Sequence, residues 1–98
     1  GRRMPNRPSA LKRLRQNEKR RVRNQRIKSR LRTEQNKFDR MVERGDLEDA
    51  REQCRLLTKL FHQAAARNIL HANKAARKQG QFERRLNQLE VRLEAAPE

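Results

Sequence analysis

Arginine and lysine are the side chains whose type and spacing in this sequence suggest a chemistry. Residues 1–32 contain 14 of them and one acid, Glu18, whereas residues 33–98 are nearly balanced in charge. The chain of 98 residues carries a formal net charge of +15. Guanidinium and ammonium groups pair with phosphate, and arginine can bind it through two parallel hydrogen bonds. Positive charge this dense and localised predicts a polyanionic partner.

The strongest candidate for phosphate binding is the basic run, residues 12–32. No proline or glycine occurs from Ser9 to Arg44, so we expect a helix, with the cations on every side of it. Like charges four residues apart destabilise a free helix, which argues against a merely solvated helix and for one that its partner orders. The candidate contact residues of this run are Lys12, Arg13, Arg15, Lys19, Arg20, Arg21, Asn24, Arg26, Lys28, Ser29 and Arg32.

A second candidate patch covers residues 71–78, His-Ala-Asn-Lys-Ala-Ala-Arg-Lys. Its basic residues are spaced so that they lie along one side of a helix. One interpretation is purely structural, with His71 or Asn73 capping a helix and alanines allowing close packing. The other is a phosphate-binding patch at a helix N-terminus. The candidates here are His71, Asn73, Lys74, Arg77 and Lys78.

Three helices should position these residues. Pro5 and Pro8 indicate an irregular segment over residues 1–8, and Ser9 is a candidate N-cap for a helix over 9–44. Gly45 suits the left-handed position that ends a helix, and Asp46 suits the N-cap of the next one, over 47–66. A third helix is expected over 72–95. Gly80 within it is either a tolerated defect or a point of close backbone approach.

Apolar residues at spacings of three and four define the expected core. They are Ile27, Leu31, Phe38, Met41 and Val42, then Leu47, Ala50, Cys54, Leu57, Phe61 and Ala64, then Ala75, Phe82, Leu86, Leu89 and Leu93. No segment alternates with the period of a strand. The predicted fold is all-α: a single domain, residues 1–98, forming an up-down-up three-helix bundle with a long basic first helix that extends beyond it.

Several other kinds of chemistry lack the residues they need. There is no glycine-rich phosphate loop, no paired nucleophile and base, and no metal-ligand spacing, so we expect neither an enzyme nor a metal or other cofactor. Cys54 is the single cysteine, which excludes an internal disulfide and favours a core position. No apolar run approaches the ~20 residues that span a bilayer, and the start lacks the apolar stretch of a secretory signal. We expect no membrane and no small-molecule substrate.

The kind of polyanion follows from the shape expected for the helix. DNA readers with an exposed basic helix usually dimerise through a zipper, and Gly45 and Gly80 interrupt the zipper-like spacing here. A helix charged on all sides suits a crevice between RNA helices, where phosphates approach from several directions. A helical DNA-binding or chromatin-type factor remains the alternative. A membrane-surface amphipathic peptide is a third, although the bundle already requires the apolar faces.

The two motifs together resemble the S-twenty family of bacterial-type small-subunit ribosomal proteins. The first motif is Ser9-Ala10-Leu11-Lys12-Arg13, followed by residues 15–21, Asn24, Lys28-Ser29 and Arg32-Thr33. The second is residues 69–78, and Gly45-Asp46 stands where that family turns between helices. The likeness covers most of residues 9–90.

The resemblance implies a three-helix structural protein that binds small-subunit (16S) ribosomal RNA early in assembly and contacts other components of the small subunit. It implies that both sets of candidate residues contact RNA, with the first helix among RNA helices of the 5′ domain. The family occurs in bacteria and plastids, so the implied location is the ribosome in a bacterial cytoplasm, or the plastid stroma. The opening Gly1-Arg2-Arg3 leaves a trimmed plastid precursor open.

Overall fold

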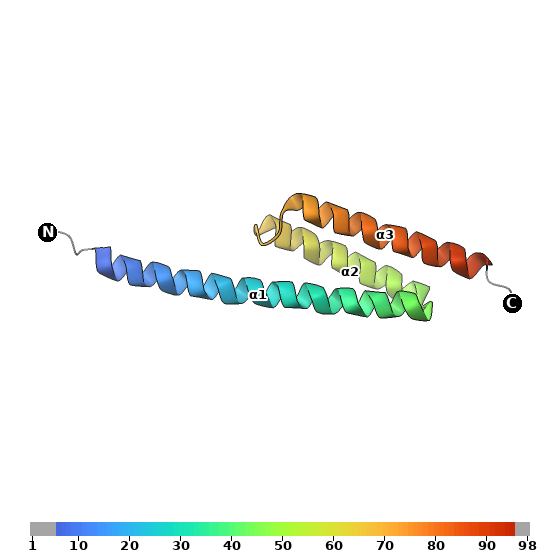
Figure 1. The fold of residues 1–98 in the computed structure, drawn as a ribbon, viewed down its shortest axis with the longest axis horizontal. Helices are drawn as coiled ribbons and strands as arrows, with labels where there is room; N and C mark the ends of the chain where they lie inside the picture. Colours follow the sequence, from blue (N-terminus) through green and yellow to red (C-terminus); the bar gives the residue numbers. More distant parts are fainter. Residues whose placement is uncertain (1–5, 96–98) are drawn as a thin grey trace.

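The computed structural model describes residues 6–95, which form three helices connected by short turns (Figure 1). The helices are α1 (Asn6–Arg44), α2 (Leu47–Ala66) and α3 (Ala72–Ala95). Each runs antiparallel to the one before it, so α1 and α3 point the same way (Figure 1). The predicted all-α bundle with a long first helix is confirmed.

The start of α1 differs from the prediction, because the helix begins at Asn6 and Ser9 lies inside it rather than at its N-cap. Pro8 therefore belongs to the first turn of α1. A proline is tolerated there because the first amides of a helix have no intrahelical acceptor, so the missing N–H costs no hydrogen bond. Residues 6–8 of the expected irregular segment are thus helical, and residues 1–5 lie outside the described part of the chain.

Helices α1 and α2 end in the same backbone hydrogen-bond pattern. Gly45 has φ +78°, its amide donates to the Val42 carbonyl at 3.1 Å, and the amide of Asp46 donates to the Met41 carbonyl at 2.9 Å. After α2, Asn68 takes the left-handed position with φ 60°, as asparagine tolerates better than most residues. These bonds form Schellman motifs, which satisfy carbonyls at the helix ends. Asp46 occupies the N-cap position of α2, but its side chain makes no capping bond.

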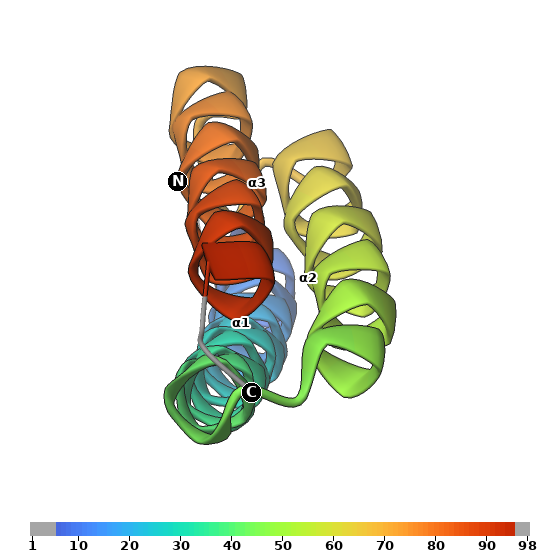
Figure 2. The same ribbon diagram turned by 90° about the vertical axis from the view of Figure 1, so that its right-hand side faces the viewer.

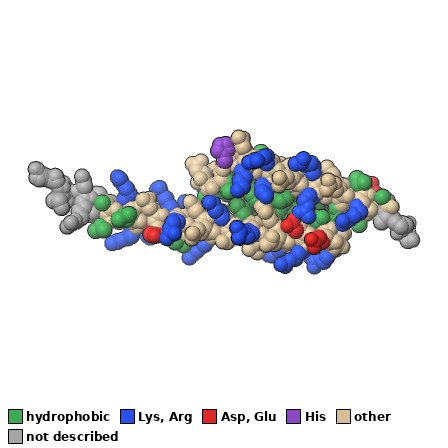
Figure 3. Space-filling model, in the orientation of Figure 1, with side chains coloured by type: hydrophobic (Ala, Val, Ile, Leu, Met, Phe, Trp, Pro, Cys, Tyr) green, Lys and Arg blue, Asp and Glu red, His purple; other side chains and the backbone are tan. Residues whose placement is uncertain are grey.

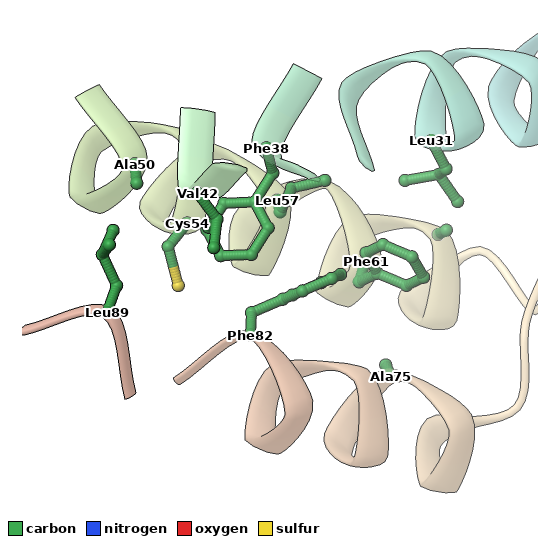
Figure 4. Packing of buried hydrophobic residues seen from close by; sticks show 11 residues of the cluster. Leu31, Phe38, Val42, Ala50, Cys54, Leu57, Phe61, Ala75, Phe82 and Leu89 are labelled. Atoms are coloured by element: carbon green, nitrogen blue, oxygen red, sulfur yellow. The ribbon is translucent and has the colours of Figure 1, made fainter. Parts of the chain in front are cut away.

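The core lies where α2 packs between the other two helices. It consists of Leu31, Phe38, Val42, Ala50, Cys54, Leu57, Phe61, Ala64, Ala75, Phe82 and Leu89, all of them predicted (Figure 4). Phe82 links the helices, because its ring centroid lies 5.3 Å from that of Phe38 on α1 and 5.8 Å from that of Phe61 on α2. Burial raises the pKa of the Cys54 thiol, which keeps it neutral, as suits a core residue.

The structure corrects the prediction for Leu93 and decides between the two interpretations of Gly80. Leu93 is 41% exposed, because α1 ends at Arg44 and leaves only the turn at Gly45 opposite this part of α3. Gly80 has no atom within 4 Å of the position that a Cβ would occupy. Of the two interpretations of this glycine, the structure supports a tolerated defect in the helix.

Polar contacts also fix the helices against one another. Gln53 on α2 is buried, and its Nε2 donates to the backbone carbonyl of Glu34 on α1 at 2.9 Å. On α3, Arg85 pairs with Asp39 and lies over the Phe38 ring, and Arg92 Nη2 donates to the Val42 carbonyl at 2.9 Å. These contacts fix the position of α3 along α1, which decides the geometry of the site described next.

Candidate nucleic-acid interface

The first half of α1 projects beyond the bundle, which makes the molecule a rod of 81 × 21 × 13 Å (Figure 1). We call residues 10–26 the basic arm, because Ile27 is the first residue of α1 that packs on the core. Every side chain of the arm is exposed except that of Asn24, which is partly buried. The arm therefore presents its cations to solvent and not to a protein groove.

The ion pairing of the arm leaves most of its charge available. Arg21 pairs with Glu18, with 2.8 Å between Nη2 and Oε2. Among the described residues, no other Lys or Arg of the arm has a carboxylate within ion-pair distance. Figure 3 shows these blue side chains standing out along the exposed length of α1. The arm is a cationic surface without a neutralising partner in the part of the chain that the structure describes.

One narrow side of the arm carries no cation. A stripe without Lys or Arg runs along it at spacings of three and four residues: Leu11, Leu14, Glu18, Val22, Gln25 and Ser29. At 100° per residue this stripe lies opposite the face that carries Ile27 and Leu31 into the bundle. Its leucines are 56% and 62% exposed. Most cations of the arm lie on one flank of this stripe, whereas Arg13 and Arg20 lie opposite it and Arg21 lies on its other flank.

The basic run and the second patch meet in one groove, which we call the α1–α3 groove. It has a volume of about 490 Å³ and lies between α1 and the start of α3, with Phe61 of α2 behind it. Figure 2 shows why, since α1 and α3 occupy one side of the bundle and α2 the other. The lining residues are Lys28, Leu31, Arg32, Gln35, Phe61, Ile69, Leu70, His71, Lys74 and Lys78.

The cationic and the apolar lining residues come from different parts of the fold. Lys28 and Arg32 stand on the α1 wall, and Lys74 and Lys78 on the α3 wall, while the apolar residues lie between them. In Figure 3, hydrophobic atoms are framed by Lys and Arg side chains where α1 and α3 lie side by side. The groove therefore has cationic walls and an apolar floor.

His71 serves as the structural cap that was one of its two interpretations. Its Nδ1 accepts a hydrogen bond from the backbone amide of Asn73 at 3.1 Å. Its carbonyl accepts from the amides of Lys74 and Ala75, which begins α3. Because Nδ1 is the acceptor, the neutral ring carries its proton on Nε2, which is free to donate outward. The capping role is thus compatible with a role in binding anions.

The predicted residues lie in the groove, in two hollows beside it, at the first turn of α3 and on the basic arm. Lys28, Arg32, His71, Lys74 and Lys78 line the groove. Ser29 lines a hollow next to Lys28, and Arg77 another next to Lys74 and Lys78. Asn73 is exposed in the first turn of α3, with its amide bound to His71. The others remain on the basic arm, away from the groove: Lys12, Arg13, Arg15, Lys19, Arg20, Arg21, Asn24 and Arg26.

Several lining residues were missed by the sequence-based reasoning. Ile69 and Leu70 looked like a connection, although two apolar residues in a short loop are a signal of packing or binding. Gln35 carries no sequence signal. Next to the groove, with Leu31 lining both, Arg30 and Arg67 line a smaller hollow of about 200 Å³. Arg67 follows the last residue of α2, so only the fold brings it beside α1.

Within residues 6–95, no group of three or more His, Cys, Asp or Glu residues could hold a metal ion. None of the three helices offers an apolar stretch long enough to cross a membrane.

Fold and site together define a class: a small helical bundle that carries an unpaired cationic helix and a cation-walled groove. The comparisons with known proteins agree with it. The family described as "Ribosomal protein S20" matches residues 5–87. The chain belongs to this family, which confirms the resemblance that the two motifs suggested.

Individual relatives support the same assignment. A protein of Cutibacterium acnes named "Small ribosomal subunit protein bS20" is 40% identical over 86 residues, covering 88% of this chain and 98% of the relative. Proteins with the same name are 46% identical over 74 residues in Rhodopirellula baltica and 38% identical over 88 residues in Geobacillus kaustophilus. The first covers 76% of this chain and 82% of the relative, and the second 90% and 99%.

Proposed function

We propose that this chain is a structural constituent of the small ribosomal subunit that binds its ribosomal RNA directly. The observation that carries the proposal is the basic arm, whose cations have one ion pair among the described residues and no protein surface to cover. Membership of the family and the printed names of the relatives support the same conclusion. Association with a ribosome in the cytoplasm follows from the proposal.

The proposed mechanism is neutralisation of phosphate. RNA helices that pack together bring phosphates close, and a cationic rod between them lowers the repulsion. The cations of the arm cover more than one side of the helix, which suits phosphates that approach from more than one direction, and the planar guanidinium groups of arginine can bind phosphate through two hydrogen bonds. The α1–α3 groove anchors the bundle end of the rod on the same RNA. This role needs no reacting group, so we propose a binding protein and not an enzyme.

Binding to a transcript of 16S ribosomal RNA tests the proposal. The full chain should bind the transcript more tightly than a DNA duplex of equal length, and the affinity should fall steeply as salt is raised from 0.05 to 0.2 M. The comparisons lend no support to the DNA-binding alternative. Tighter binding to the DNA duplex would reject the proposal in favour of that alternative.

We propose that the candidate residues named from the sequence make the individual contacts with RNA. The arm cations and the cations of the groove walls should touch phosphate, whereas Asn24 and Ser29 should bind sugar or base edges. Arg21 is less suitable than Arg20 as a phosphate ligand, because Glu18 already holds its guanidinium. Arg20→Ala should therefore weaken binding to the transcript more than Arg21→Ala does. The reverse order would contradict the assignment of these two side chains.

A further inference from the structure

Phosphate binding explains the walls of the α1–α3 groove but leaves its floor unexplained. Ile69 and Leu70 are only partly buried, and they line the groove together with cations of α1 and α3, although polar residues would serve phosphate equally well there. Leu31 and Phe61 complete the floor and are 5% and 2% exposed. An accessible apolar surface enclosed by unpaired cations fits a ligand that carries negative charge around an apolar part.

We infer that the groove binds one unpaired nucleotide of RNA, with its base on the apolar floor and its phosphates on the cationic walls. The inference rests on the proposed function and adds to it the kind of RNA element recognised. RNA-binding proteins commonly take unstacked bases from loops and bulges onto apolar or aromatic surfaces. A volume of about 490 Å³ lies within the ~300–1,000 Å³ typical of pockets for small ligands.

Different lining residues would bind the phosphates and the base of the nucleotide. Lys28 and Arg32 face Lys74 and Lys78 across the groove, so phosphates on both sides of the extruded base meet a cation. The ring of Phe61 is almost fully covered, so the base gains from burial of apolar area and not from face-to-face stacking on an exposed ring. The Ile69 and Leu70 side chains offer the accessible part of that area.

Polar groups at the edge of the floor give the base hydrogen-bond partners. Gln35 lines the groove from α1, and its amide can donate and accept, as the edge of a base requires. Across from it, His71 keeps Nδ1 occupied by the amide of Asn73, which leaves the Nε2 proton for a phosphate oxygen or ribose hydroxyl. The groove therefore combines an apolar surface with hydrogen-bond donors and an acceptor.

A base-deletion experiment tests the inference on the RNA side, with the full wild-type chain. Three RNA hairpins would be compared by fluorescence anisotropy at 0.1 M salt: fully paired, with one bulged adenosine, and with an abasic nucleotide in place of that adenosine. The two bulged hairpins have the same charge and backbone. The adenosine bulge should bind about tenfold more tightly than the abasic one, because only the base can bury apolar area on the floor.

Two variants test the protein side. Leu70→Ser should abolish the preference for adenosine over the abasic nucleotide, whereas Val91→Ser, which changes an exposed residue elsewhere on α3, should retain it. Equal affinity of wild-type protein for the two bulges would overturn the inference and leave the proposed function intact if both affinities fall with salt. Failure to bind any of the three hairpins would overturn the inference, and the proposed function would fall with it only if the chain also failed to bind the 16S transcript.

Discussion

Removing one cation from each wall of the α1–α3 groove should weaken RNA binding strongly without affecting the fold. Arg32 on α1 and Lys74 on α3 are exposed, and neither has an ion pair among the described residues. The double variant Arg32→Ala/Lys74→Ala therefore removes two phosphate ligands and no contact that stabilises the bundle. Its thermal unfolding, followed by circular dichroism, should match that of the wild-type chain.

The magnitude follows from counterion release. Each phosphate contact contributes about 0.7–0.9 to the slope of log affinity against log salt. Relative to 1 M salt, one contact is then worth roughly five- to eightfold in affinity at 0.1 M, and two contacts roughly 25- to 60-fold. Filter binding to a 16S transcript at several salt concentrations measures both quantities. We expect the slope of the double variant to be smaller by roughly 1.4–1.8.

The matched control is Arg55→Ala/Lys59→Ala, which removes the same charge from exposed positions on α2 outside the groove. It should change the affinity far less. Equal losses in both variants would show that affinity depends on total charge alone, which would refute the groove as a place of binding. An unchanged slope in the groove variant would show that Arg32 and Lys74 do not touch phosphate.

Four further predictions concern the arm and the bundle. Except at Asn24 the arm is exposed along its described length, so circular dichroism should show helix content rising with added RNA; full helicity in low salt without RNA would contradict this. His71→Ala should cost about 1 kcal/mol of stability and His71→Asn much less, since asparagine also caps. Phe82→Ala should cost about 3–5 kcal/mol in urea unfolding, because it leaves a cavity between aromatic rings. Glu34→Gln should make unfolding less dependent on pH in the acidic range.

The sign of that last effect follows from the surroundings of Glu34. Burial raises the pKa of this carboxyl, but hydrogen bonds from Lys37 and Gln53 and the charges of Lys37 and Arg30 outweigh burial, and the pKa lies below its ordinary value of 4.5. The unfolded chain therefore binds the proton more readily. The contribution to stability is present above pH 4.5 and is lost as the pH falls through the folded pKa. Urea unfolding midpoints measured across this range check the prediction.

Local signals were sufficient to predict most of the fold. Gly45 marks a left-handed helix end that few other residues adopt, so the boundary between the first two helices was predictable. The apolar stripes predicted the core, because burial follows the helical period. The start of α1 was not predictable, because a proline in a first turn is compatible with a helix that begins before or after it.

The candidate site was predictable in composition but not in arrangement. Sequence identified the cations on each helix, yet their meeting in one groove depends on how far α3 is displaced along α1. That displacement is set by long-range contacts such as Phe38 with Phe82 and Asp39 with Arg85, which no local pattern specifies. The apolar floor was missed for the same reason, since Ile69 and Leu70 acquire their role only when α1 lies beside them.

Within the described part of the chain, most acidic residues that form ion pairs lie in the bundle, whereas most unpaired cations that would bind RNA lie on the arm. All but one of the ion pairs among residues 6–95 lie in the bundle, where Glu34, Asp39, Asp46, Glu48 and Glu90 neutralise nearby cations. The bundle can therefore pack without strong internal repulsion, while repulsion along the arm acts on a segment that contributes nothing to the core. Because the cost of concentrating charge falls on the arm alone, RNA that binds the arm relieves that cost without having to reorganise the bundle.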